Sequence, residues 1–196
     1  MAKEAKVVTE TEKKLTKFKR LTSIPYLLIF VAFCLPLLTF SCANKVNSTE
    51  EASEIASYNA YELASGLKID DIDNKEFKMY MKSVQTLNPD AAAQFKQLEQ
   101  PNMVLFGVFA GILVASIFAW FTPLGSLIMG FCSMTVMWMF INQVQMIMSD
   151  IGVKSFVFVD AAYGAFGATM LFAIAFAMNL AAIIRPLVDK FKNRKK

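Results

Sequence analysis

Apolar and polar positions are sharply separated along the chain. No charged residue occurs in stretches 21–44 and 101–149, and Asp160 is the only one in stretch 156–184. About 20 apolar residues span the hydrocarbon core of a bilayer, so the first and third stretches each predict one membrane helix and the second predicts two. The sequence FTPLGS, in the middle of the second stretch, supplies a turn between those two. The predicted membrane helices cover residues 22–42, 102–121, 124–148 and 156–184.

Charge then predicts the orientation of these helices. The tail 1–21 carries seven basic residues against three acidic ones, and the end 185–196 carries six against one. The segment 43–101 carries six basic and ten acidic residues. Basic flanks of membrane helices stay in the cytoplasm, so both tails are expected there and the acidic segment outside. An even number of crossings is required, which four helices satisfy. We therefore predict an all-α fold: an integral membrane four-helix bundle with a small helical extracytoplasmic cap between its first two helices.

The cap is expected to consist of short helices. In EEASEIASYNAYELASGL the apolar residues recur at helical spacing, with Ser48 or Thr49 as the N-cap and Gly66 as the stop. In NPDAAAQFKQLEQP, Asn88 caps a helix that has Pro89 in its first turn. The acidic residues between these helices favour a solvated turn over a calcium site, because the EF-hand ligand order and glycine are missing; they are Asp70, Asp71, Asp73 and Glu76. Two interpretations stay open, a cap that covers the bundle and a docking surface for an extracytoplasmic partner.

The run VAFCLPLLTFSC ends the first predicted helix. It is longer than a signal-peptide core and follows a charged tail, and Phe40 stands where a lipoprotein signal needs a small residue. Cys34 and Cys132 fall inside predicted helices, so Cys42 is expected to be a free thiol where the first helix leaves the membrane. Pro36 is expected to kink that helix.

The stretch LPLLTFSC, followed by YNAYELASGL, resembles a pattern found in uncharacterised bacterial multi-span inner-membrane proteins. In that pattern an LPF-like turn and a Ser-Cys pair precede a Gly-Tyr-x-Leu-x-x-Gly motif. The resemblance covers about 30 residues, and it departs from the pattern at Leu37 and at Asn59-Ala60. It implies a multi-pass protein of the bacterial inner membrane and no known activity.

No catalytic, metal or cofactor site is predicted. The chain has no histidine, which excludes a histidine-based triad and imidazole-bound zinc or haem. No glycine-rich phosphate loop precedes a lysine. The third predicted helix is rich in methionine and contains Cys132, and such soft ligands suit Cu(I). Methionine also fills irregular helix contacts, which is the interpretation we favour.

Three polar residues inside the predicted helices are candidates for a role within the membrane; they are Asn142, Gln145 and Asp160. The two amides share one face of the third helix, where such side chains usually form hydrogen bonds to a neighbouring helix. Lining an aqueous path is the alternative. Asp160 is expected near the outer interface, with Lys154 as a possible partner, and a proton relay is the alternative role.

The fourth predicted helix opens with small residues at four-residue spacing, which let two membrane helices approach closely. This small-residue seam packs either within the chain or against another subunit, and it consists of Ala161, Gly164, Ala165, Gly167 and Ala168.

Basic residues at both ends are expected to lie on anionic lipid headgroups; they are Lys13, Lys14, Lys17, Lys19, Arg20, Lys192, Arg194, Lys195 and Lys196. Nucleic-acid binding is not expected, because membrane topology already accounts for these charges. The function predicted is a non-enzymatic structural or accessory subunit of a larger membrane complex. Its expected partners are membrane lipids and other membrane subunits or further copies of the chain. A small transporter or channel component is the alternative.

Overall fold

The computed structural model describes most of the chain and divides it into two compact units. The residues it describes are 17–18, 20–44, 51–67, 75, 78–79, 82–83, 86, 89–150 and 157–193. The first unit comprises Met1–Val31, Val108–Thr135 and Ala168–Lys196, and the second comprises Ala32–Gly107 and Val136–Gly167.

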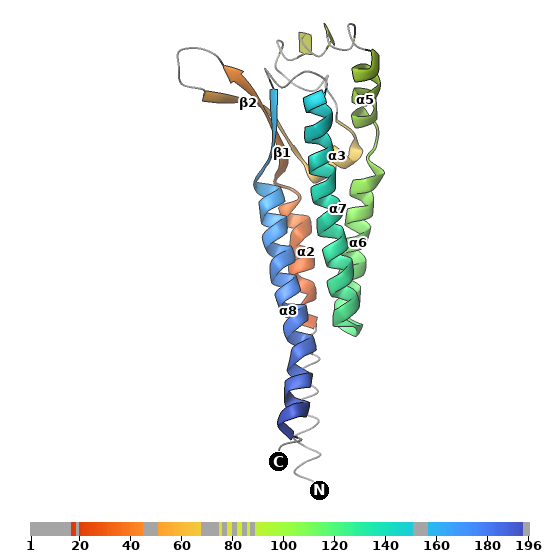
Figure 1. Cartoon of the computed structure of the whole chain (residues 1–196), viewed down its shortest axis with the longest axis vertical. Helices are drawn as coiled ribbons and strands as arrows, with labels where there is room; N and C mark the ends of the chain where they lie inside the picture. The colour runs from red at the N-terminus through yellow and green to blue at the C-terminus, as the bar shows by residue number, and fades with distance from the viewer. Residues whose placement is uncertain are drawn as a thin grey trace. The chain divides into compact units, whose positions relative to one another are not determined.

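Three helices are long and apolar enough to cross a membrane. They are α6 (Met103–Phe121), α7 (Pro123–Asp150) and α8 (Tyr163–Asn193) (Figure 1). Only Thr122 separates α6 from α7, and its backbone N–H donates to the Phe118 carbonyl oxygen over 2.8 Å. Pro123 opens α7, where its missing N–H leaves no intrahelical bond unmade. These helices give the protein a multi-pass membrane character.

The expected first membrane helix over 22–42 is much shorter in the structure. Helix α2 covers Ser23–Ala32, which is 10 residues. At 1.5 Å per residue its length is about 15 Å, half of a bilayer core. Pro36 does not kink a helix but begins strand β1 (Pro36–Asn44). Proline lacks the N–H that a helix needs and disfavours helical backbone at the preceding residue, so the helix ends before it.

In the first unit, each helix buries one stripe of side chains. On α6 the buried residues Val108, Ile112, Ala115 and Ala119 recur every three or four positions. The ring of Tyr26 on α2 meets that of Phe172 on α8 edge-on, with centroids 6.4 Å apart, and the two helices run side by side in Figure 1. The other faces expose large apolar side chains, as expected for helices that meet lipid.

The second unit contains a three-stranded antiparallel sheet, so the all-α prediction is confirmed only in part: the described residues are mostly helical, and this small sheet is present in addition. Its strand order is β2-β1-β3, with β2 at Glu51–Asn59 and β3 at Val157–Ala161. The expected helix over EEASEIASYN is therefore a strand, and the expected membrane helix over 156–184 begins only at Tyr163. Phe40 lies opposite Ala56 and Val159 in the register and is buried. Its ring meets that of Tyr58 edge-on, with centroids 5.6 Å apart.

Short helices follow the sheet. Helix α3 (Ala60–Ser65) is capped by Asn59, whose side-chain oxygen accepts the N–H of Glu62 while the Glu62 carboxylate accepts the N–H of Asn59. This capping box, rather than Ser48 or Thr49, starts the helix. Gly66 ends it with φ 104°, as the sequence predicts.

A further helix, α5, covers Pro89–Glu99. The Leu67 N–H donates to the Leu98 carbonyl, and the Asn102 N–H to the Ala64 carbonyl. These bonds fasten α3 beside the junction of α5 and α6. The expected cap Asn88, together with Ser48, Thr49 and the acidic turn, lies outside the described residues.

Candidate functional site

A polar cluster joins three helices inside the first unit. It consists of Tyr26 on α2, Ser126 on α7 and Asn179 on α8. The Tyr26 hydroxyl donates to the backbone oxygen of Ser126 over 3.0 Å. The amide Nδ2 of Asn179 donates to the Tyr26 hydroxyl and to the Ser126 hydroxyl, each over 3.2 Å. All three residues are buried.

The cluster fastens helices and offers little to a reactant. The hydroxyl of Tyr26 both donates and accepts, so its hydrogen-bonding capacity is largely used. Asn179 Oδ1 is the one buried side-chain polar atom that lacks a partner among the described residues. Each interhelical bond contributes about 0.6 kcal/mol in a membrane. The cluster therefore fixes which faces of α2, α7 and α8 meet.

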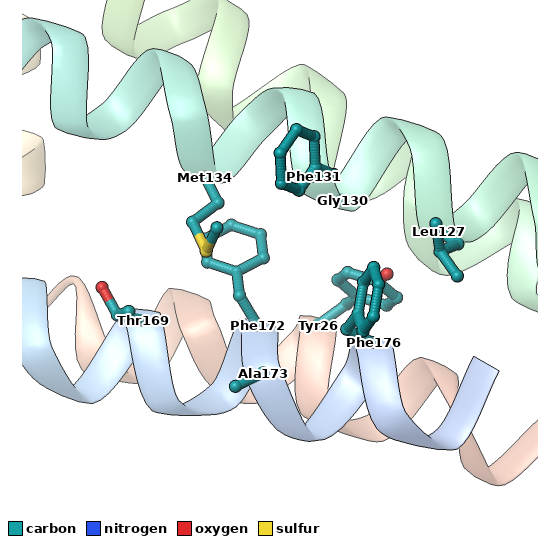
Figure 2. Close-up of a pocket in the computed structure, with 9 residues that line it drawn as sticks. All are labelled: Tyr26, Leu127, Gly130, Phe131, Met134, Thr169, Phe172, Ala173 and Phe176. Atoms are coloured by element: carbon teal, nitrogen blue, oxygen red, sulfur yellow. The ribbon is translucent and has the colours of Figure 1, made fainter. Parts of the chain in front are cut away.

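An apolar cavity of about 360 Å³ lies beside this cluster. Figure 2 shows side chains of α7 and α8 lining it from two sides, with Tyr26 from α2 between them. Its walls are aliphatic and aromatic, with the hydroxyls of Tyr26 and Thr169 as exceptions; the lining residues are Tyr26, Leu127, Gly130, Phe131, Met134, Thr169, Phe172, Ala173 and Phe176. Such a lining accommodates an apolar group and contains no charged side chain.

Gly130 makes room for Tyr26. A Cβ atom on Gly130 would collide with the Tyr26 hydroxyl and lie 2.7 Å from its Cε1 atom. The phenol ring therefore rests on the bare backbone of α7, which brings its hydroxyl to Ser126. The sequence offered one signal for this cluster, namely the lone amide of Asn179 in an otherwise apolar run.

The sheet of the second unit has one buried and one polar face. Opposed residues of an antiparallel sheet share a face. Thr39 lies opposite Ser57 and Asp160, and Ser41 lies opposite Glu54 and Phe158. We call this surface the polar sheet face; it consists of Thr39, Ser41, Glu54, Ser57, Phe158 and Asp160. Phe158 is 46% exposed on it, which is unusual for a large apolar side chain between polar neighbours.

The predicted intramembrane polar residues separate into different roles. Gln145 Nε2 donates to the Val159 carbonyl oxygen over 2.9 Å, so it fastens α7 to β3 and not to another helix. Asn142 is exposed on α7. Asp160 lies in β3 and is exposed there, outside any helix, and its expected partner Lys154 lies outside the described residues.

The small-residue seam divides between a strand and a helix. Ala161 belongs to β3, and the other four residues lie on α8. Gly164 is buried within the second unit, where a Cβ atom would lie 2.6 Å from the Leu35 carbonyl oxygen and 2.7 Å from that of Pro36. Gly167 has an ordinary neighbour at 3.7 Å, the Cβ atom of Ala32. At Gly164, then, the small residue lets α8 pack closely against the backbone of its own chain, and not against another subunit.

Of the predicted lipid-facing basic residues, Lys17 and Arg20 are exposed, and Lys192 lies in α8. The others lie outside the described residues; they are Lys13, Lys14, Lys19, Arg194, Lys195 and Lys196.

Cys34 and Cys132 are exposed and form no disulfide within the described residues, while the side chain of Cys42 lies outside the described part of the chain. Partial burial raises the pKa of Tyr61 on α3, and an electrostatic contribution from the nearby Cys34 adds to this effect. Among the described residues, no group of three or more Cys, Asp or Glu side chains is arranged to hold a metal ion.

The class of protein that these features define is a multi-pass membrane protein that also contains a small three-stranded sheet. Comparison with known protein families finds no match, and comparison with curated proteins finds none either.

Proposed function

We propose that this protein is a non-enzymatic structural or accessory subunit of a larger membrane complex, and that the polar sheet face is its contact surface. The proposed location is the bacterial inner membrane, with both termini in the cytoplasm and the sheet outside. The charge distribution supports this orientation, because the tails are basic and the segment 43–101 is acidic.

The observation that carries the proposal is the exposed polar face of the sheet in the second unit. Glu54, Ser57 and Asp160 are exposed on this face. Phe158 offers an apolar contact on that face, and the outer edges of β2 and β3 have no strand partner among the described residues. Exposed sheet edges and isolated aromatic side chains are common docking features.

The small-residue seam supports the proposal less than the sheet does, because Gly164 is buried against the chain's own backbone. The alternative, a small transporter or channel component, needs a polar path past Asn142, Gln145 and Asp160. The amide of Gln145 instead fastens β3, which disfavours this alternative.

Site-specific photo-cross-linking in intact cells tests the proposal. A photoreactive residue at Ser57 or Phe158 should form an adduct with one and the same protein, which also stays bound in native mass spectrometry. The control is Met170, which is 69% exposed on α8 and belongs to no surface assigned here. A monomer in native mass spectrometry, without protein adducts at either sheet position, would refute the subunit assignment.

A further inference from the structure

Two arginine side chains of the first unit lie over aromatic rings. The guanidinium carbon of Arg20 is 5.7 Å from the centre of the Trp120 ring, and that of Arg185 is 5.9 Å from the centre of the Phe18 ring. A cation within about 6 Å of a ring centre is attracted to the ring face. These ring contacts orient both guanidinium groups.

Arg185 also borders a cleft. The cleft has a volume of about 460 Å³, and Phe18, Ala181, Ile184 and Val188 form its other walls. It is thus apolar except for one guanidinium group. That group is exposed, so its N–H edges remain accessible beside the ring contact. An arginine that stacks on a ring through its face keeps the donors in its plane for another ligand.

The position of the cleft along α8 indicates the source of that ligand. The apolar, membrane-crossing part of α8 ends at Pro186, directly after Arg185. Trp120, the other stacked ring, is one residue from the end of α6, and its Nε1 donates to the hydroxyl of Ser23. Tryptophan with a bonded indole N–H is typical of the membrane interface. Arg185 therefore lies where hydrocarbon gives way to lipid headgroups.

We propose that this cleft binds an anionic phospholipid. The guanidinium group of Arg185 binds the headgroup phosphate through paired N–H donors, and the apolar walls contact the first methylene groups of an acyl chain. Arginine matches phosphate geometry with two parallel hydrogen bonds. A soluble phosphate ion would bind the guanidinium group without contacting the apolar walls, whereas a phospholipid can contact both. This inference does not depend on the proposed subunit role.

Native mass spectrometry of the full-length protein, stripped of lipid in detergent and titrated with single lipids, tests the proposal. The wild-type protein should bind phosphatidylglycerol more tightly than phosphatidylcholine of the same chain length. Arg185→Gln should weaken phosphatidylglycerol binding about tenfold, because a charge-assisted bond to phosphate is lost. Phosphatidylcholine has the same phosphate but also a choline cation that is repelled by Arg185, so its weaker binding should fall by less.

The matched control is Lys17→Gln, which removes the same charge from an exposed residue outside the cleft. Lys17 is expected to contribute only diffuse attraction to the headgroups, so this variant should weaken phosphatidylglycerol binding far less than Arg185→Gln does. Arg185→Lys keeps the charge but loses the paired donors, so its affinity should fall between those of the wild type and Arg185→Gln. If Lys17→Gln and Arg185→Gln lose the same affinity for phosphatidylglycerol, the lipid is held by diffuse electrostatic attraction and not by a site. This result would overturn the proposal. Equal binding of the two lipids by the wild type would overturn it as well.

Discussion

Two glycines of α8, three residues apart, have different surroundings. The backbone of Gly164 lies directly against carbonyl oxygens of the segment that joins α2 to β1, whereas Gly167 faces one side-chain carbon at an ordinary distance. Both residues are helical, so the intrinsic effect of replacing either with alanine is a gain in helix propensity. Any difference between the two variants then reports the close approach alone.

We predict that Gly164→Ala lowers the free energy of unfolding by about 2 kcal/mol, because the new methyl group displaces a backbone segment that cannot rotate away. Gly167→Ala should leave it unchanged or raise it by up to about 1 kcal/mol. Thermal unfolding of both variants in the same detergent measures the difference. Equal unfolding temperatures would show that α8 does not rest on this segment.

Asn179 gives a second prediction at this scale. Asn179→Leu keeps most of the side-chain volume and removes the donor to Tyr26 and Ser126, so stability should fall by about 1 kcal/mol. The control is Asn142→Leu, the same replacement at an exposed position of α7 without a hydrogen bond among the described residues. A loss of stability in the control as large as in Asn179→Leu would assign the effect to side-chain polarity in general, not to the cluster.

At the scale of elements, the sequence predicts what depends on local apolar content and misses what depends on distant pairing. Helices α6 and α7 follow from uninterrupted apolar runs and the FTPLGS turn. In β1 the run LPLLTFSC is equally apolar, but its residues pair with 51–59 and 157–161. Strand preference depends on such neighbours more than on the residues themselves. The residues of VFVDA alternate between the two faces of β3, but an apolar helix follows almost directly. The sequence therefore predicts that this segment is the start of that helix.

The candidate site was harder to predict for the same reason. Gln145 was recognised as a hydrogen-bonding residue, but its partner is the backbone of β3, which is a strand only in the folded sheet. Tyr26 and Ser126 were not singled out, because hydroxyl groups are unremarkable within apolar runs. Their importance comes from meeting Asn179, which is more than 50 residues from either along the chain.

Gln145 supplies the prediction at the scale of elements. Gln145→Leu removes the bond to Val159, so backbone amides of β3 should exchange with deuterium faster, by about fivefold for a loss of about 1 kcal/mol. Gln143→Leu is the matched control, since Gln143 is exposed on the same helix and has no hydrogen bond among the described residues. If the β3 amides of Gln145→Leu exchange at the wild-type rate, the pairing with β1 alone stabilises β3.

At the scale of the whole molecule, the number of membrane crossings decides the topology. Three helices are long enough to cross, while α2 has 10 residues. Basic tails at both ends nevertheless require an even number of crossings. Helical residues at 17–18 and 20–21 precede α2. We propose that this segment makes a fourth crossing, which would reconcile the charges with the elements.

Cysteine labelling checks this topology. In a variant without native cysteines, Ser57→Cys should react with a membrane-impermeant maleimide in intact cells. Lys17→Cys should react only after the membrane is opened. Both positions are exposed, so a difference in labelling reflects the side of the membrane and not burial. Labelling of Lys17→Cys in intact cells would place the N-terminal tail outside the cell membrane. The chain would then cross the membrane three times, and its two ends would lie on opposite sides.

The pairing of β1 with β3 sets an order for biosynthesis. The hairpin of β1 and β2 can form as soon as both strands have left the translocon, because few residues separate them. The inner strand of the sheet must then wait until about 100 further residues have been translated, which takes on the order of ten seconds at 5–20 residues per second. During that interval its second edge is open to any extended chain nearby. Closure by β3 happens only after α7 has been inserted, so a completed sheet marks a nascent chain whose preceding helices are already in place.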